Sequence, residues 1–263
     1  MGEFTGTVYY RQRGILVLTP TFVVPAEDRT LHRPVIRVLL AGAGNFALEY
    51  PDGRRIESRA LMTSPLMERG DIRAENVDFA LFDFAVASPE YVALQPLLET
   101  RDLRLLDPVL FDHLMPMLKA GQAGTLTCAE VTELAAEVVQ ILTGRRPAPL
   151  EFDARVMAAL ELIERLPLAE IKLPRLAQAA NLSPDRFRHL FRATTGSTVS
   201  QYARSTAVWR ALMLLSEHRS ITEASHAAGF HDVSHFYRAY ADLFGISLSE
   251  KNNIRKFRRV RCF

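Results

Sequence analysis

The chain contains 263 residues, of which 48% are hydrophobic and 24% are charged, as is typical of a soluble globular protein. This length accommodates two domains of ordinary size, each with its own core. The net charge of +2 conceals an uneven distribution. Residues 1–150 carry 15 Lys and Arg against 19 Asp and Glu, whereas residues 151–263 carry 17 against 11. We therefore expect nucleic acid to bind only the second half.

Several classes of protein are excluded by what the sequence lacks. Its two cysteines, Cys128 and Cys262, are too few for a disulfide framework or a zinc site. The first residues show no basic-then-apolar pattern of a signal peptide, and no apolar run approaches the ~18 residues that a membrane span requires. We therefore expect a cytoplasmic protein.

Residues 1–88 are predicted to form β structure. Five short runs rich in β-branched and aromatic residues occur there, at 15–24, 35–41, 44–50, 54–62 and 77–86. Pro51-Asp52-Gly53, between two of these runs, is a strong hairpin signal. Several short strands at close spacing indicate a β-sandwich or a small barrel.

Two charged residues interrupt the apolar runs of this region. Arg37 lies within VIRVLL and Asp83 within FALFDFAV, and a charge in such a run must be paired, exposed or used by a ligand. We weigh a mutual ion pair or an edge position against a contact with a small-molecule effector. No metal site is predicted, because His32 is the one histidine of the region and no ligand cluster surrounds Glu68.

Two helices are predicted next, at 107–120 and 127–143. Pro116 should kink or shorten the first helix. The second begins with a capping box, formed by Thr127 and Glu130, and carries an apolar stripe that ends at Gly144. Val139 adds apolar surface outside that stripe.

A linker is predicted at 145–149, where two prolines block a helix and apolar periodicity is absent. A helix follows at 153–166, with Val156, Leu160 and Ile163 on its inner face.

The stretch 176–196, LAQAANLSPDRFRHLFRATTG, predicts two helices joined by a tight turn. Asn181 tolerates the positive φ of a helix end, and Ser183-Pro184 supplies an N-cap followed by proline at the first helical position. On the second helix, Phe187 and Phe191 share an apolar face. Its other face is basic and carries Arg186, Arg188, His189 and Arg192. This layout is that of a helix-turn-helix whose second helix enters the DNA major groove.

The same pattern recurs at 222–245, TEASHAAGFHDVSHFYRAYADLFG. Gly229 takes the place of Asn181, as a position that needs positive φ requires, and Asp232 is the expected N-cap. Such a repeat indicates two copies of one supersecondary unit. Between them, residues 200–215 form a helix-compatible run of roughly 24 Å. This length suits two reading helices in successive major grooves, about 34 Å apart.

This part of the chain resembles the DNA-binding domain of AraC/XylS-type transcription regulators. The resemblance is carried by LAQAANLSPDRFRHLF, Gly196, Gln201-Tyr202, and the stretch from Ile221 to Gly245 with its Ala-Gly-Phe and Ser-His-Phe elements. After Glu250 the sequence KNNIRKFRRVRCF replaces the tyrosine-containing ending that is usual in the family.

The resemblance implies an α+β protein. We expect an N-terminal cupin-like β half-barrel with a helical dimerisation hairpin at 1–146, a linker at 147–152, and a C-terminal all-α domain with two helix-turn-helix motifs at 153–263. Alternatively, the two helices of the hairpin pack only within their own chain.

The resemblance also implies a transcription activator that binds double-stranded DNA, contacts RNA polymerase and forms a homodimer. A small-molecule effector or a regulatory protein would act on its N-terminal domain. No enzymatic activity, cofactor or membrane contact is expected. Two other hypotheses stay open: a regulator without a small-molecule ligand, controlled by a protein partner or by its own abundance, and a cupin-type enzyme that the DNA-binding module only localises.

The family's base-reading positions fall on defined residues of both second helices. On the first of these helices they are Asp185, Arg188 and His189, with Arg186 nearer its start. On the second they are Val233, Ser234, His235, Tyr237 and Arg238. Arginine can bond two acceptors on guanine at once. Arg192 and Arg204 are better placed for phosphates. The alternative is that these side chains are merely solvated.

Two further patterns have weaker interpretations. His231 and His235 have the i, i+4 spacing of zinc ligands, but Asp232 caps between them, so we do not expect a zinc site. The tail is strongly basic and either adds nonspecific phosphate contacts or has no fixed role. Its charged residues are Lys251, Arg255, Lys256, Arg258, Arg259 and Arg261.

Overall fold

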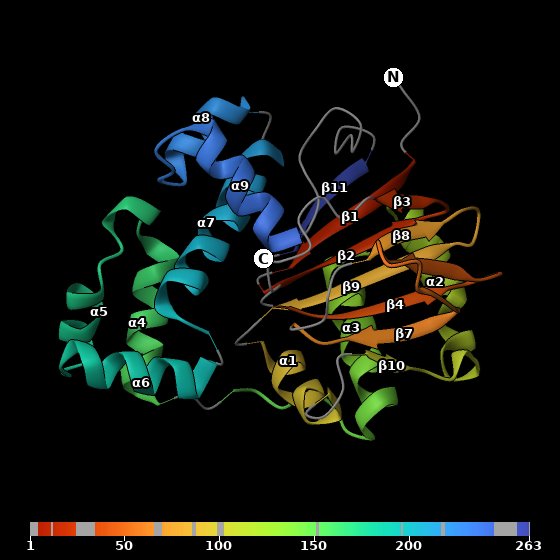
Figure 1. Cartoon of the computed structure of the whole chain (residues 1–263), viewed down its shortest axis with the longest axis horizontal. Helices are drawn as coiled ribbons and strands as arrows, with labels where there is room; N and C mark the ends of the chain where they lie inside the picture. The colour runs from red at the N-terminus through yellow and green to blue at the C-terminus, as the bar shows by residue number, and fades with distance from the viewer. Residues whose placement is uncertain are drawn as a thin grey trace. The chain divides into compact units, whose positions relative to one another are not determined.

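The chain forms two compact units in the computed structural model, which describes residues 5–11, 13–24, 35–65, 70–85, 88–98, 103–150, 153–195, 197–216, 219–244 and 257–262. One unit consists of Met1–Ala148 together with Phe244–Phe263, and the other of Pro149–Leu243. We call them the N-terminal unit and the helical unit (Figure 1). His32 and Glu68 lie outside the described residues.

Two sheets form the N-terminal unit. The larger has seven strands in the order β10-β7-β4-β9-β2-β1-β11, and the smaller has four in the order β3-β8-β5-β6. The strands are β1 (Gly6–Arg11), β2 (Gly14–Thr19), β3 (Phe22–Val24), β4 (Val35–Ala41), β5 (Phe46–Glu49), β6 (Arg55–Ser58), β7 (Ala60–Thr63), β8 (Asp71–Ala74), β9 (Phe79–Ala85), β10 (Leu103–Leu105) and β11 (Phe257–Cys262).

The predicted N-terminal β region is confirmed, since each of the five runs contains at least one strand. β5 and β6 pair across the expected hairpin, where Gly53 has a φ of 85°. Of the remaining strands, β1 lies in the predicted β region before the first run, and β8 and β10, with four and three residues, are too short to show periodicity. The central strands β2 and β4 are buried along their whole length, which explains their unbroken apolar sequences.

Arg37 and Asp83 form an ion pair across β4 and β9, where they are register partners. Nε and Nη2 of Arg37 donate to the two carboxylate oxygens of Asp83 at 2.6 and 2.5 Å. Their side chains are 5% and 0% exposed. Of the interpretations weighed above, the mutual ion pair is the one observed. Each charge compensates the desolvation of the other.

The helices of the N-terminal unit are α1 (Pro89–Leu94), η1 (Gln95–Leu98), η2 (Pro108–Leu114), α2 (Met115–Gln122) and α3 (Cys128–Thr143), where η marks a 3₁₀ helix. The predicted helix at 107–120 is thus divided. Pro116 lies in the first turn of α2, where its missing N–H costs nothing. α3 has the predicted capping box of Thr127 and Glu130 and ends at Gly144, whose φ is 74°.

The position of Val139 outside the main stripe predicted additional apolar surface on α3. The structure contradicts this prediction. The side chain of Val139 is fully buried within its own chain, like those of Val131, Leu134 and Val138. The apolar face of α3 is therefore wider than its stripe, because neighbouring elements cover more than one side of the helix. α3 lies against α1, η2 and β11.

The basic tail differs most from the prediction. Instead of remaining with the DNA-binding domain, it returns to the N-terminal unit as β11, which pairs in parallel with β1 from Gly6↔Phe257 to Arg11↔Cys262. Cys262 forms a disulfide with Cys128. Two cysteines are too few for a disulfide framework, but the fold brings these two residues, 134 positions apart, into one bond that the sequence did not predict. Lys251, Arg255 and Lys256 lie outside the described residues.

The helical unit contains only helices among its described elements. They are α4 (Ala154–Arg165), η3 (Leu168–Glu170), α5 (Leu173–Ala179), α6 (Pro184–Thr195), α7 (Val199–Ser216), α8 (Ile221–Ala227) and α9 (Val233–Phe244). α7 lies between the α5–α6 pair and the α8–α9 pair (Figure 1), and it contacts both α6 and α8. None of the described helices is both long and apolar enough to cross a bilayer.

The buried ion pair generates a prediction about stability. Asp83→Leu leaves Arg37 as an uncompensated buried charge, and we expect the free energy of unfolding to fall by about 3–5 kcal/mol. The double variant Arg37→Met, Asp83→Leu removes both charges and should recover most of that loss. Urea unfolding followed by circular dichroism measures both, and equal losses in the two variants would contradict mutual compensation.

Candidate nucleic-acid interface

α5, a tight turn and α6 form the first candidate reading motif. The turn residue Asn181 has a φ of 52°, as its sequence position predicted. The N–H of Leu182 donates to the carbonyl of Ala177 at 2.9 Å, which satisfies one of the free carbonyls at the end of α5. Oγ of Ser183 accepts from the N–H of Arg186 at 3.4 Å, a long capping hydrogen bond. The chain thus reverses within four residues and starts α6 in a fixed direction.

α6 has one buried and one exposed face. Phe187 and Phe191 are fully buried, with ring centroids 5.6 Å apart, and Phe191 meets Tyr202 of α7 edge-on at 5.7 Å. These aromatic contacts fix the rotation of α6 about its own axis. The predicted contact residues all fall on the exposed face: Asp185, Arg186, Arg188, His189 and Arg192.

Asp185 and Arg188 interact on this exposed face. Nη1 of Arg188 donates to Oδ1 of Asp185 at 3.1 Å, one helical turn apart. The two side chains are 57% and 81% exposed, so the pair contributes little to stability. Its consequence is orientation, because the carboxylate restricts where the guanidinium of Arg188 can reach.

α8, a turn and α9 form the second candidate motif. Gly229 has a φ of 88°, and a Cβ added there would lie 2.4 Å from the backbone nitrogen of Leu168. That nitrogen donates to the carbonyl of Ala228 at 3.1 Å. Glycine is therefore required twice at this position, for the backbone conformation and for the close approach of η3.

Both helices of the second motif begin with side-chain caps. Ser220 and Glu223 form a capping box at α8 that the S-x-x-E pattern of the sequence could have revealed. Asp232 caps α9, as predicted, by accepting from the N–H of His235 at 2.6 Å. This hydrogen bond, with a smaller contribution from the ring of His231, lowers the pKa of Asp232.

α9 repeats the division of α6 into two faces. Phe236 and Tyr240 are buried, whereas Ser234, Tyr237 and Arg238 are exposed. His235 and Val233 differ from the other predicted contact residues because they are only partly exposed. The ring of His235 lies edge-on to Phe230 with centroids 5.2 Å apart, so much of its surface is used in packing.

Two arginines of α7 hold the helical unit together, and sequence reasoning missed both contacts. Arg210 donates to the carbonyls of Leu166 and Glu164 at 2.6 Å each, which satisfies the last turn of α4, and burial lowers its pKa. Arg204, which the sequence places for phosphate contact, donates to Asp242 of α9 at 3.0 Å and keeps 41% of its side chain exposed. Neither pairing has a local sequence signal, because the partners are 38 or more residues apart.

His231 is paired with its neighbour, since its Nδ1 lies 3.0 Å from Oδ2 of Asp232. Within the described residues, no group of three or more His, Cys, Asp and Glu side chains is arranged to hold a metal ion.

Comparison with known proteins agrees with this geometry. A family model described as "Helix-turn-helix domain" matches residues 176–253, which include both reading helices. The Transcriptional activator NphR from Rhodococcus sp. is 32% identical over 133 residues, which are 49% of this chain and 39% of NphR. The helix-turn-helix match and the similarity to NphR support the resemblance of this part of the chain to AraC/XylS-type transcription regulators.

Two solved structures have the same overall fold as this chain. ToxT from Vibrio cholerae O395 superposes with a TM-score of 0.53 at 10% identity, covering 92% of this chain and 98% of ToxT. ToxT from Vibrio cholerae strain SCE256, with bound unsaturated fatty acid, gives 0.52 at 9% identity, covering 96% and 97%. The chain thus spans nearly all of a ToxT structure but about two-fifths of its curated relative NphR.

The crowded turn of the second motif generates a prediction. In Gly229→Ala the new Cβ meets η3 and the positive φ disfavours it, so we expect the helical unit to lose about 2–4 kcal/mol of stability. Asn181→Ala is the matched control, because a Cβ already exists there, and it should cost about 1 kcal/mol or less. Trp209, the one tryptophan of the sequence, lies on α7 and reports unfolding by fluorescence. Equal losses of stability in Gly229→Ala and Asn181→Ala would mean that the close approach of η3 does not exclude a side chain at position 229.

Proposed function

We propose that this protein is a sequence-specific DNA-binding transcription regulator that acts as an activator. The observation that carries the proposal is the paired exposed faces of α6 and α9, each on a helix whose opposite face is anchored by buried aromatic rings. Its resemblance to AraC/XylS-type regulators and its match to an activator, NphR, support the same function.

Two kinds of side chain on the exposed faces are proposed to contribute differently to DNA binding. Affinity comes mainly from arginines that neutralise phosphates, and sequence choice from side chains that meet base edges. Arg188 and Arg238 lie near the middle of their helices and are proposed to read guanine. Asp185 holds Arg188 in a restricted direction, which favours one base position over its neighbours. Arg192, near the end of α6, is proposed to contact a phosphate.

The N-terminal unit is proposed to form the cupin-like half-barrel that senses a signal. Arg37 and Asp83 satisfy each other, so a structural role accounts for both without an effector. A polar groove of about 460 Å³ lies between η2 and α3, lined by His113, Glu133, Glu137, Gln140, Ile141, Gly144 and Arg146. An effector or a regulatory protein bound there would bias arrangements of the two units that differ in DNA affinity.

The structure of ToxT with a bound unsaturated fatty acid shows that this fold can hold a small molecule in another protein. We propose that an effector or a regulatory protein acts on the N-terminal unit of the present chain. We further propose that the chain works in the cytoplasm and contacts RNA polymerase. The rival hypothesis, a cupin-type enzyme localised by the DNA-binding module, draws no support from the described residues.

Two arginine substitutions test the DNA-binding proposal. Arg188→Ala and Arg238→Ala should each weaken binding to a specific duplex by about 1–3 kcal/mol more than binding to a random duplex. The specific duplex is obtained by mapping the fragments that the protein binds in cells.

Arg192→Ala is the matched control for this test. It should weaken both duplexes equally and make the slope of log affinity against log salt shallower by about 0.9, the value of one phosphate contact. Titration at several salt concentrations measures both effects. If Arg188→Ala and Arg238→Ala weaken both duplexes equally, as expected for Arg192→Ala, these two arginines do not contact bases.

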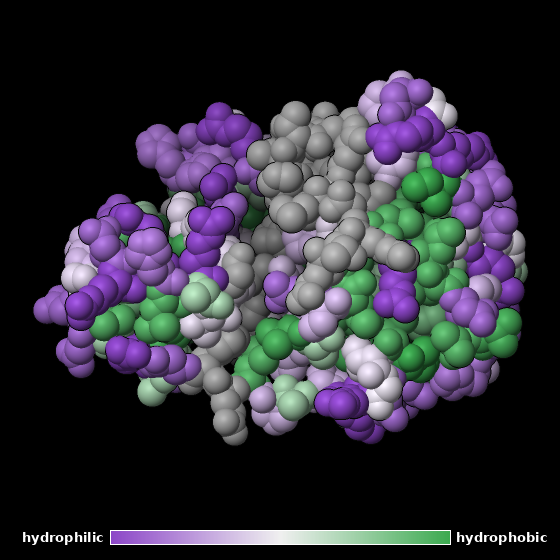
Figure 2. Space-filling model, turned by 60° about the horizontal axis from the view of Figure 1, so that its bottom comes forward, coloured by the Kyte–Doolittle hydropathy of each residue, from purple (hydrophilic) through white to green (hydrophobic). Residues whose placement is uncertain are grey.

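We also propose that the chain forms a homodimer through its N-terminal unit. Figure 2 shows apolar side chains gathered on the face of this unit that is turned to the viewer. On the edge strand β10 and the adjoining η2, Leu105, Val109 and Leu110 are 59%, 66% and 48% exposed. Apolar side chains beside a free strand edge favour association between chains.

The double variant Val109→Glu, Leu110→Glu tests this surface. Charges there would be buried in the proposed dimer, so the molar mass by light scattering at micromolar concentration should fall from two chains to one. Val92→Glu, on a 41% exposed position of α1, is the control and should leave the mass unchanged. A wild-type chain that is already monomeric would contradict the proposal.

A further inference from the structure

β11 is seated on the N-terminal unit by specific side-chain contacts as well as by its pairing with β1. A Cβ at Gly6 would lie 3.0 Å from the ring of Phe257, and one at Gly124 would lie 2.4 Å from Cδ of Arg258. The two glycines therefore leave room for side chains of β11. β11 is the last strand of the larger sheet, so it has a sheet neighbour on one side only. An edge strand of this kind can leave without breaking the rest of the sheet.

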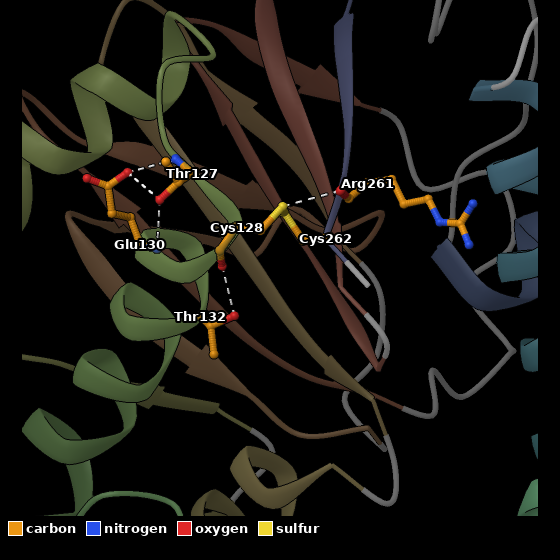
Figure 3. The surroundings of a disulfide bond; sticks show 6 residues. All are labelled: Thr127, Cys128, Glu130, Thr132, Arg261 and Cys262. Atoms are coloured by element: carbon orange, nitrogen blue, oxygen red, sulfur yellow. Dashed lines mark hydrogen bonds between the residues drawn. A yellow bond between two sulfur atoms is a disulfide. The ribbon is translucent and has the colours of Figure 1, made fainter.

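Cys262, the last residue of β11, is bonded to Cys128, the first residue of α3, and the two Cα atoms are 4.9 Å apart (Figure 3). Both cysteines are partly exposed. Small thiols and disulfides in solution can therefore reach the pair. The disulfide therefore joins the end of the edge strand β11 to the start of α3.

Cys128 lies at the start of α3 and beside the end of β11. Its backbone lies in the first turn of a 16-residue helix, where the helix dipole stabilises a negative charge. Arg258, Arg259 and Arg261 on β11 add positive charge to the same strand edge. In the same turn, Glu130 accepts from the N–H and hydroxyl of Thr127 at 2.7 Å each, as part of the capping box of α3.

Chain connectivity gives this bond a consequence for the helical unit. The chain leaves the N-terminal unit after Ala148, forms the helical unit, and returns at Phe244. While β11 is seated, the helical unit is attached at both ends and the arginines of β11 are held on the sheet. When β11 leaves, one attachment is lost and these arginines move with the helical unit.

We propose that Cys128 and Cys262 are a thiol–disulfide modification site that controls the seating of β11. In the disulfide form β11 is locked on β1. In the dithiol form it exchanges between seated and released states, and the released arginines add phosphate contacts to DNA bound by the helical unit. The last consequence rests on the DNA-binding function proposed above.

The oxidant and reductant are low-molecular-weight disulfides and thiols. The Cys128 thiolate, having lost its proton to solvent, attacks one sulfur of a small disulfide, which forms a mixed disulfide and releases one small thiolate. The Cys262 thiolate then attacks Sγ of Cys128, which forms the protein disulfide and releases the second small thiolate. Two electrons pass from the cysteines to the small disulfide, and the reverse steps reopen the bond. Disulfides of proteins in reducing compartments are usually of this transient, redox-sensing kind.

The seating of β11 is tested on the full chain in glutathione buffers of varied oxidised-to-reduced ratio. Alkylation followed by non-reducing electrophoresis measures the disulfide, and amide hydrogen exchange of residues 257–262 and 6–11 measures strand pairing. We expect a reversible intramolecular disulfide, with exchange of both segments at least tenfold faster in the dithiol form. Cys128→Ser and Cys262→Ser should match the dithiol form at every ratio. Equal exchange in both forms, or a bond that forms only between chains, would overturn the proposal.

The DNA consequence has its own variant. With a random duplex, the dithiol form should have a steeper salt slope by about 0.9 for each arginine that reaches a phosphate. The triple variant Arg258→Ala, Arg259→Ala, Arg261→Ala keeps both cysteines and should lose this redox dependence of the slope. If the wild-type slope does not change with redox state, the arginines of β11 do not reach DNA and that part of the proposal fails. If no form binds DNA, the proposed function fails, while hydrogen exchange still decides the seating of β11.

Discussion

Burial of aromatic side chains on one face of α6 and of α9 is the interaction on which the arrangement of the helical unit depends. Phe187 and Phe191 on one helix, and Phe236 and Tyr240 on the other, fix the rotation of each helix about its axis. The polar residues between them are then forced to the outside. An arginine at an exposed position of a freely rotating helix would have no defined direction, whereas Arg188 and Arg238 project from helices that cannot turn.

α7 extends this constraint from each motif to the whole unit. Tyr202 on α7 packs on the first motif, Arg204 pairs with Asp242 of the second, and Arg210 satisfies the carbonyls at the end of α4. The same helix therefore contacts elements from both motifs and from the helix that precedes them. The spacing of the two motifs is therefore set by one helix of about 27 Å, the length of eighteen helical residues at 1.5 Å each.

Several buried polar side chains of the N-terminal unit are paired within the unit. Arg37 and Asp83 satisfy each other, and Thr7 and Tyr9 on β1 donate to the carbonyls of Gln122 and Gly121 in α2. β1 is thereby held on one side by α2, while its outer edge accepts β11. This arrangement explains how a strand from the far end of the chain can complete the sheet without disturbing its core.

Local features of the structure were determined by the sequence itself. Helix caps, positive-φ turns and apolar periodicities act over a few residues, so Thr127 with Glu130, Asn181, Gly229 and Asp232 could be read directly, and the repeat placed both reading helices. The N-terminal β region followed from its β-branched runs, although its shortest strands carried too little periodicity. The family resemblance predicted which exposed residues of each helix contact bases.

Tertiary structure alone decided the contacts between residues distant in sequence. The pairing of Arg204 with Asp242, the partial burial of His235, the full burial of Val139 and the return of β11 to β1 leave no local pattern, since each depends on which surfaces meet after folding. The basic residues of 257–262 predicted a segment that is exposed to solvent or contacts DNA. Its backbone instead pairs with the edge of β1. Two cysteines 134 residues apart become neighbours only because the chain crosses an entire second unit before it comes back.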